Sequence, residues 1–230
     1  MPDFIELLEA RPDWAVAVKP FGCLSEDAAP RGPQDDGEEG MPSLLRRELD
    51  RRGLPYEDVF PVHRLDRTTE GLMVYALTKK GASVLSAAAA DGRIAKIYTA
   101  YITAAPDLPE AGEMRDFLYF DRRRDKSFVV NAVNAANGDR RGAKEAVLRY
   151  EITGRSVPWK GTTVARAKVE LLTGRTHQIR VQFGSRRSPL LGDGKYGSRV
   201  NRKGPSLFST ELAFPWEGET VRFRRDAELI

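Results

Sequence analysis

Residues 165–171 of this chain alternate strictly between apolar and charged side chains. Alanine, valine and leucine occupy the odd positions, and arginine, lysine and glutamate occupy the even positions. Successive side chains of a β-strand point to opposite faces, so the pattern predicts a strand with one buried and one solvated face. Such half-buried strands are typical of antiparallel sheets, because parallel strands are buried on both faces. We therefore expect an antiparallel sheet in the core.

Other segments predict further strands and a few helices. Apolar or alternating runs predict strands at residues 14–18, 71–77, 96–102 and 146–152. Helical patterns cover residues 44–52, 80–90 and 176–183. Ser43 is the expected N-cap of the first helix, and Gly53 is expected to end it. Between residues 105 and 142 the pattern loosens into proline-rich turns, two short apolar stretches at residues 117–120 and 128–130, and a basic stretch at residues 122–124, and no element is assigned.

Many strands and few helices, without regular alternation between the two, favour an α+β fold with a mostly antiparallel mixed sheet and flanking helices. We expect a single domain over residues 1–230. Residues 24–40 hold six acidic residues and several glycines and prolines, so they predict a mobile acidic loop within that domain.

The composition excludes several classes of protein. No apolar run is long enough for a membrane span, and the N-terminus shows no secretory signal. Cys23 is the only cysteine and is expected to be a small buried apolar residue. With only two histidines, a zinc site built from cysteine and histidine is not expected. We expect a cytoplasmic, monomeric protein with no membrane partner, metal or small-molecule cofactor.

Charge is distributed unevenly along the chain, although the formal net charge is only +4. Residues 1–50 contain 12 acidic and 5 basic residues, whereas residues 161–204 contain 10 basic and 2 acidic ones. A basic region of this kind favours contact with a polyanion, although a solvated surface is the alternative.

Asp66 is the first residue with an unusual setting, because it lies between arginines just before a strand expected to be buried. A carboxylate there is costly unless it is paired or used. One interpretation is a structural ion pair with Arg64 or Arg67. The other is a nucleophile or base kept ionised by a guanidinium. The residues around Asp66 do not decide between them.

Four motifs together resemble the RluA-type pseudouridine synthases. They are the segments Val16–Gly22, His63–Leu72, Lys96–Tyr98 and Gly174–Val181, the last followed by Leu191–Gly197. Their order along the chain matches that family, and they span about residues 14–197. The resemblance implies the pseudouridine synthase catalytic fold, with a central active-site cleft, and an isomerase that converts uridine in ribosomal or transfer RNA to pseudouridine.

The resemblance also implies roles for individual residues. Asp66 matches the catalytic aspartate, Tyr98 the tyrosine that stacks on the target base, and Arg180 the arginine that pairs with the aspartate. Arg64 matches an arginine that enters the RNA helix where the flipped-out uridine has left. The residues expected to bind RNA or the uridine are Arg64, Arg67, Lys96, Arg175, His177, Gln178, Leu190 and Leu191. Core or structural roles remain the alternatives for Tyr98 and His177.

The sequence departs from the family pattern at two positions. Glu70 replaces a small serine, and Gln182 stands where relatives usually have histidine. Few residues precede the first matching strand, so we expect no S4 RNA-binding domain and expect the catalytic domain itself to select the substrate.

Two alternative functions remain open from the sequence. The first is a non-catalytic RNA-binding or chaperone module on the same fold. The second is a metal-dependent phosphodiesterase using His63 and Asp66, for which the scattered acids offer no convincing ligand set.

Overall fold

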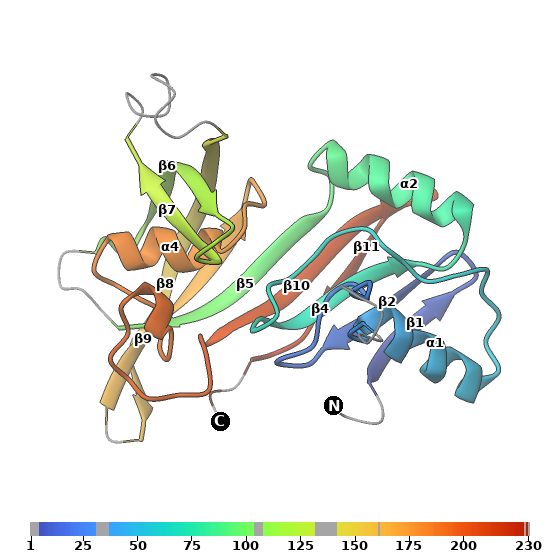
Figure 1. Ribbon diagram of the computed structural model, residues 1–230, viewed down its shortest axis with the longest axis horizontal. Coiled ribbons are helices and arrows are strands. Elements are labelled where there is room, and N and C mark those ends of the chain that lie inside the picture. Colours follow the sequence, from blue (N-terminus) through green and yellow to red (C-terminus); the bar gives the residue numbers. More distant parts are fainter. Residues whose placement is uncertain are drawn as a thin grey trace. The chain divides into compact units, whose positions relative to one another are not determined.

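The computed structural model describes residues 5–30, 37–103, 108–131, 142–160, 162–227 and 229. The chain divides into two compact units (Figure 1). The first unit lies within Met1–Lys96 and Ser209–Asp226, and the second within Ile97–Phe208 and Ala227–Ile230. Each combines antiparallel strands with helices, which confirms the α+β prediction. The prediction of a single domain stays a prediction.

In the first unit, four strands lie in the order β1-β2-β4-β10, with β3 paired to β4 and β11 paired to β10. Its elements are β1 (Glu6–Arg11), β2 (Trp14–Lys19), α1 (Met41–Arg52), β3 (Phe60–Pro61), β4 (Glu70–Ala76), α2 (Lys79–Ala90), β10 (Leu207–Trp216) and β11 (Glu219–Arg224). The strands predicted at residues 14–18 and 71–77 and the helix predicted at residues 80–90 are therefore confirmed.

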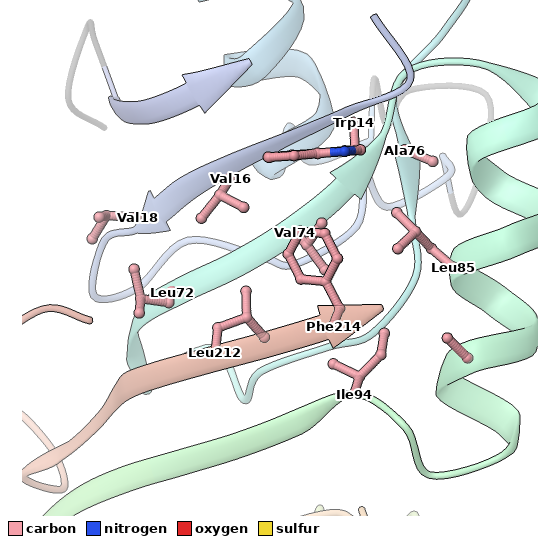
Figure 2. Close-up of a cluster of buried hydrophobic side chains, with 11 residues drawn as sticks. Trp14, Val16, Val18, Leu72, Val74, Ala76, Leu85, Ile94, Leu212 and Phe214 are labelled. Atoms are coloured by element: carbon pink, nitrogen blue, oxygen red, sulfur yellow. The ribbon is translucent and has the colours of Figure 1, made fainter. Parts of the chain in front are cut away.

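The core of the first unit forms on one face of these strands. Side chains from β2, β4 and β10 meet there and are covered by Leu85 of α2 and by Ile94 (Figure 2). Trp14 contacts Phe214 edge to face, with ring centroids 5.2 Å apart. Strands β2 and β4 are almost wholly buried along their length. The core thus fixes β4, the strand that follows Asp66.

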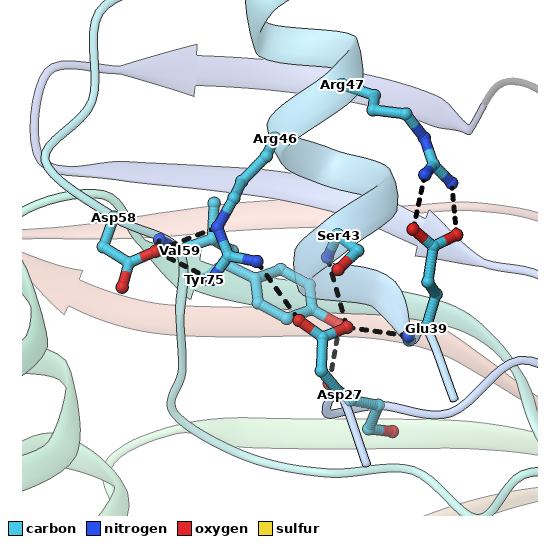
Figure 3. Close-up of polar contacts among 10 residues, drawn as sticks. Asp27, Glu39, Ser43, Arg46, Arg47, Asp58, Val59 and Tyr75 are labelled. Atoms are coloured by element: carbon cyan, nitrogen blue, oxygen red, sulfur yellow. Dashed lines mark hydrogen bonds and ion pairs between the residues drawn. The ribbon is translucent and has the colours of Figure 1, made fainter. Parts of the chain in front are cut away.

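Helix α1 begins three residues earlier than predicted, and Ser43 is not its N-cap. Gly40 occupies that position, and the Asp27 carboxylate accepts hydrogen bonds from the backbone N–H of Gly40 and of Ser43 (Figure 3). A side chain distant in sequence therefore satisfies the exposed amides of the first turn. Gly53 ends the helix in the left-handed conformation, as predicted.

The predicted acidic loop, residues 24–40, lies partly outside the described residues. Its described ends pair with each other, with Ala28 opposite Glu38. Asp27 also bonds Arg46, which bonds Asp58 in turn (Figure 3). The mobility of the segment stays a prediction.

In the second unit, the strands lie in the order β5-β9-β8-β6-β7. Its elements are β5 (Ala95–Ile102, whose first two residues still belong to the first unit), β6 (Ala111–Asp121), β7 (Lys126–Val130), β8 (Lys144–Trp159), β9 (Thr162–Leu171), α4 (Gln178–Ser185) and the 3₁₀ helix η1 (Gly194–Tyr196). Strand β9 is buried on its apolar face, which confirms the alternation observed in the sequence.

The sequence assigned no element between residues 105 and 142, but the structure contains two strands in that segment. Strands β6 and β7 form an antiparallel hairpin there, with Asp121 opposite Lys126 across the turn. The hairpin is half-exposed on both sides, so its residues lack the clear apolar period that identifies β9.

Helix α4 also differs from its prediction, because it begins at Gln178 rather than at residue 176. His177 precedes it with a φ of 56°, a left-handed conformation that an α-helix does not allow. Residues 178–183 are all buried, so α4 has no solvated face in its first two turns. The helices among the described residues are too short or too polar to cross a bilayer.

Candidate functional site

Asp66 lies in the first unit, on the loop that enters β4, and its side chain is half-buried. The backbone of that loop is held from several sides. The Ser25 hydroxyl donates to the Leu65 carbonyl at 2.8 Å and accepts from the Leu65 N–H at 2.9 Å. Within the loop, the Thr69 N–H donates to the Asp66 carbonyl. The carboxylate therefore stands on a fixed main chain.

Lys19 holds the same loop through its side chain. That side chain is completely buried, and its ammonium donates to the carbonyls of Cys23 at 2.6 Å, Arg67 at 3.0 Å and Pro20 at 3.1 Å. Burial lowers the pKa of Lys19 to about 8, against the attraction of the Cys23 thiolate form and of Asp66. The sequence did not reveal this role, although Lys19 lies in the Val16–Gly22 motif.

Gly71 explains why the motif contains a glycine at the start of β4. Its φ is +117°, and an added Cβ would lie 2.2 Å from the Ser209 carbonyl oxygen. Strand β10 passes too close for any side chain at this position. The first residues of β4 therefore pack directly against β10, immediately after the loop that carries Asp66.

His63 is held as a neutral structural residue in the first unit. Its Nε2 accepts a hydrogen bond from the Val74 N–H at 3.2 Å, so that lone pair is already used. Burial lowers the pKa of His63 to about 3, and the charge of nearby Lys96 contributes to that lowering. Burial lowers the pKa of Lys96 as well. A neutral imidazole whose acceptor nitrogen is occupied is a poor metal ligand, which weakens the phosphodiesterase alternative.

The two arginines beside Asp66 differ. Arg67 donates to the Gly22 carbonyl through Nε and binds both oxygens of Glu38 through its terminal nitrogens. Arg64 is exposed and makes no hydrogen bond or ion pair with any residue that the structure describes. The Arg67 guanidinium is therefore used in bonds within the protein, while the Arg64 side chain extends into solvent.

Arg180 lies in the second unit, on α4, and is almost completely buried. Its Nε and one terminal nitrogen bind the two oxygens of Asp193 at 2.7 and 2.9 Å. Its guanidinium carbon also lies 5.1 Å from the centre of the Tyr196 ring. The motifs identified Arg180 but not these two partners, although both lie in the Leu191–Gly197 string.

The turn around Asp193 is fixed by glycine and by Tyr196. Gly192 has a φ of +81°, and an added Cβ would lie 2.4 Å from the Gly204 carbonyl oxygen. The Tyr196 hydroxyl lies 2.9 Å from Nδ1 of His177 and accepts from the Ser127 N–H at 2.8 Å. Burial raises the pKa of Tyr196 to about 12. These contacts favour the structural interpretation of His177.

Gln178 and Arg175 close the turn before α4. The Gln178 Oε1 accepts from the Thr173 hydroxyl at 2.8 Å and from the Arg175 N–H at 3.0 Å. The Gln178 Nε2 is buried without a hydrogen-bond partner among the described residues. Arg175 is half-exposed, and its Nε donates to the Glu145 carbonyl.

Tyr98, Leu190 and Leu191 are buried in the second unit. Tyr98 lies on β5, opposite Val169 of β9. Leu190 pairs with Ile102, and Leu191 packs in a cluster with Tyr101. Both leucines are wholly buried, so they have a core role in this structure, and contact with the uracil stays a proposal.

The structure thus groups the predicted residues by unit. Asp66, Arg64, Arg67 and Lys96 belong to the first unit, and Tyr98, Arg180 and the other predicted residues belong to the second. Among the described residues, no three histidine, cysteine or acidic side chains are placed to hold a metal ion.

Residues 13–185 match the family of RNA pseudouridylate synthases, and the chain belongs to this family. The RluA-type resemblance of its motifs is thereby confirmed. The fold agrees: the human RNA pseudouridylate synthase domain containing 1 superposes with a TM-score of 0.76 at 18% identity. That likeness covers 98% of this chain and 84% of the human chain.

Individual relatives carry more specific names. Ribosomal large subunit pseudouridine synthase D of Pseudomonas aeruginosa is 32% identical over 212 residues, covering 90% of this chain and 59% of that protein. The protein of the same name from Zymomonas mobilis is 34% identical over 153 residues, with 66% and 43% covered. The tRNA pseudouridine synthase C of Vibrio vulnificus is 29% identical over 165 residues, with 69% and 62% covered. The chain spans about half the length of these relatives.

Proposed function

We propose that this chain is an RNA pseudouridine synthase that isomerises uridine in ribosomal or transfer RNA. Family membership supports the reaction class, and the names of the relatives support RNA as the substrate. The observation that carries the proposal is the loop of Asp66: its main chain is held by Lys19 and Ser25, while its carboxylate remains half-exposed. A purely structural aspartate has no need for such a rigid support.

The reaction conserves every heavy atom. The bond between N1 of uracil and C1′ of ribose breaks, the base turns, and a bond forms between C5 and C1′. The proton on C5 is lost to solvent, and N1 gains one. No electrons are exchanged with another molecule, so the proposal needs no cofactor. Holding the detached base against the ribose favours recombination over loss of the base.

Asp66 is the proposed catalytic residue. Its carboxylate attacks the ribose or the base covalently, or it removes a proton from C2′ to give a glycal; the two routes remain alternatives. The Lys19 ammonium and the Asp66 carboxylate attract each other, so Lys19 places a positive charge near the reacting group.

The other residues have proposed roles in the same reaction. Tyr98 stacks on the base, and Arg180 stabilises the negative charge of the aspartate. Arg64 fits insertion into the RNA helix after the uridine has flipped out, because its side chain is exposed. Arg67, Lys96, Arg175, His177, Gln178, Leu190 and Leu191 remain the proposed contacts to RNA or uridine. We further propose that the protein acts as a monomer in the cytoplasm.

Tritium release tests the function directly. Unmodified ribosomal and transfer RNA transcripts labelled at C5 of uridine are incubated with the wild-type protein and with the Asp66→Ala variant. Release by the wild type alone supports the isomerase and the role of Asp66. RNA binding by both proteins, without release from any transcript, instead supports the non-catalytic RNA-binding alternative.

A further inference from the structure

The second unit contains a pocket of about 470 Å³ between the β6–β7 hairpin and the turn before α4. It is lined by Leu118, Tyr119, Phe120, Arg122, Ser127, Gly142, Lys144, Gly174, Arg175 and Thr176. A volume of this size is within the range of small-ligand sites. Only Arg175 among these residues belongs to the proposed contacts with RNA, so the pocket is a feature that the proposed function has not used.

The charged residues among the described lining of the pocket are all basic. They are Arg122, Lys144 and Arg175, and that described lining holds no aspartate or glutamate. Arg122 and Lys144 are exposed, and neither forms an ion pair with a residue that the structure describes. Other arginines nearby differ from them: Arg115 binds Glu113 and Glu145, and Arg186 binds Asp116. Two uncompensated cations at one pocket favour an anionic ligand.

The walls of the pocket are firm. The Ser127 hydroxyl donates to the Thr176 carbonyl at 2.6 Å and so joins β7 to the turn before α4. The Nε of Arg175 donates to the Glu145 carbonyl at 2.8 Å, which joins the same turn to β8. The Phe120 ring contacts the His177 ring edge to face, with ring centroids 6.1 Å apart. A ligand therefore meets preformed walls.

We propose that this pocket binds one nucleotide of the RNA substrate other than the target uridine. Arg122 and Lys144 bind its phosphates, and the Phe120 ring, which lies on the same face as Ser127, contacts its base. The proposal rests on the proposed function, because it takes RNA as the substrate. It assigns the β6–β7 hairpin a part in selecting the RNA.

RNA fits this pocket better than other anions. An acidic peptide would use the cations but not the aromatic ring of Phe120, whereas a nucleic-acid base stacks on aromatic side chains irrespective of its identity. Single-stranded RNA supplies both groups at a fixed spacing.

Salt-dependent binding tests the proposal. The Arg122→Ala/Lys144→Ala variant is compared with an Arg11→Ala/Lys79→Ala control, which removes the same charge from the first unit. The Kd of a fluorescent 12-nucleotide single-stranded RNA is measured by anisotropy from 50 to 300 mM KCl. We expect at least 5-fold weaker binding by the pocket variant at 100 mM KCl. Its salt slope should be shallower by about 1.4, or roughly 0.7 for each phosphate that the variant no longer neutralises.

A second variant tests the Phe120 ring. Phe120→Leu should weaken binding by roughly 5-fold or more while leaving the salt slope unchanged, because stacking releases no counterion. Wild-type Kd and slope in the Arg122→Ala/Lys144→Ala variant would overturn the proposal. Displacement of the RNA by polyglutamate or by uridine monophosphate at equal charge concentration would also overturn it, in favour of an acidic protein or a free nucleotide.

The same preparations separate this proposal from the proposed function. Tritium release by the wild type, together with unchanged binding by the pocket variant, overturns the pocket and leaves the isomerase in place. Weakened binding by the pocket variant, without release by the wild type from any transcript, supports the pocket as an RNA site and removes the isomerase.

Discussion

The loop that carries Asp66 and the helix that carries Arg180 are held in opposite ways. In the first unit, Lys19 and Ser25 bind main-chain groups of the loop, and the Asp66 side chain remains half-exposed. In the second unit, the contacts are made to the side chain itself, because Asp193 binds two nitrogens of the buried guanidinium. In the loop, the described bonds fix the main chain that carries the carboxylate, whereas on α4 they fix the charged group itself.

This contrast predicts the largest effect for Asp66→Asn. The substitution leaves the loop contacts in place, so the variant should keep its wild-type stability and lose about 10³-fold or more in kcat. Single-turnover tritium release measures the loss, and a thermal melt measures the stability. Glu70→Gln is the matched control, four residues along the chain, and should retain most activity. Comparable losses in the two variants would contradict the assignment.

Asp193→Asn should instead act on stability. It leaves the Arg180 charge buried without its carboxylate, at a cost of about 3–5 kcal/mol in the free energy of unfolding. Urea denaturation measures this cost. The Arg180→Leu/Asp193→Leu double variant should recover part of it, because both buried charges are removed. A single variant that loses less than about 1 kcal/mol would show that Asp193 does not hold the guanidinium.

Lys19 predicts a dependence of stability on pH. The folded protein releases the Lys19 proton at about pH 8, whereas the unfolded chain keeps it to the usual pKa of 10.5. The unfolded state therefore binds more protons between these values, and the stability rises with pH through that window. Between pH 7 and pH 11, the free energy of unfolding of the wild type should rise by up to about 3 kcal/mol relative to that of the Lys19→Met variant. Urea denaturation at each pH measures both values. A stability difference between the two proteins that does not change with pH would indicate that Lys19 has an ordinary lysine pKa.

Ser25→Ala should have the smallest effect. The loss of one hydroxyl leaves the N–H and the carbonyl of Leu65 without their partner, at a cost of about 1–2 kcal/mol in stability. We expect kcat for tritium release to fall several-fold, because the main chain beside Asp66 is less well fixed. Ser86→Ala, on the exposed side of α2, should change neither quantity. Equal results for the two serines would show that the Ser25 contacts do not position the loop.

The sequence predicted the elements whose side chains follow a clear period. Strands β2, β4 and β9 were identified because burial imposes an apolar run or a strict alternation. The hairpin of β6 and β7 was missed because both of its faces are partly exposed. The N-terminus of α1 was misplaced because Asp27, 13 residues before Gly40, supplies the cap. Local patterns do not contain a contact of that kind.

For the candidate site, the motifs identified residues but not their partners. Asp66 and Arg180 were named from strings that match the family, while Asp193 and Lys19 lie in neighbouring strings and were not given a role. Their roles depend on burial: each is almost fully enclosed and forms its bonds across the fold. A sequence motif shows which residues occur together, whereas three-dimensional packing determines which of them are in contact.

The single thiol of the chain provides a built-in kinetic reporter. Cys23 is 1% exposed, and burial raises its pKa, so the folded protein should react with a maleimide only when this segment opens. Its carbonyl accepts the shortest of the three Lys19 bonds. The labelling rate therefore measures how often the support of the Asp66 loop detaches, and a bound RNA that stabilises the loop would slow it.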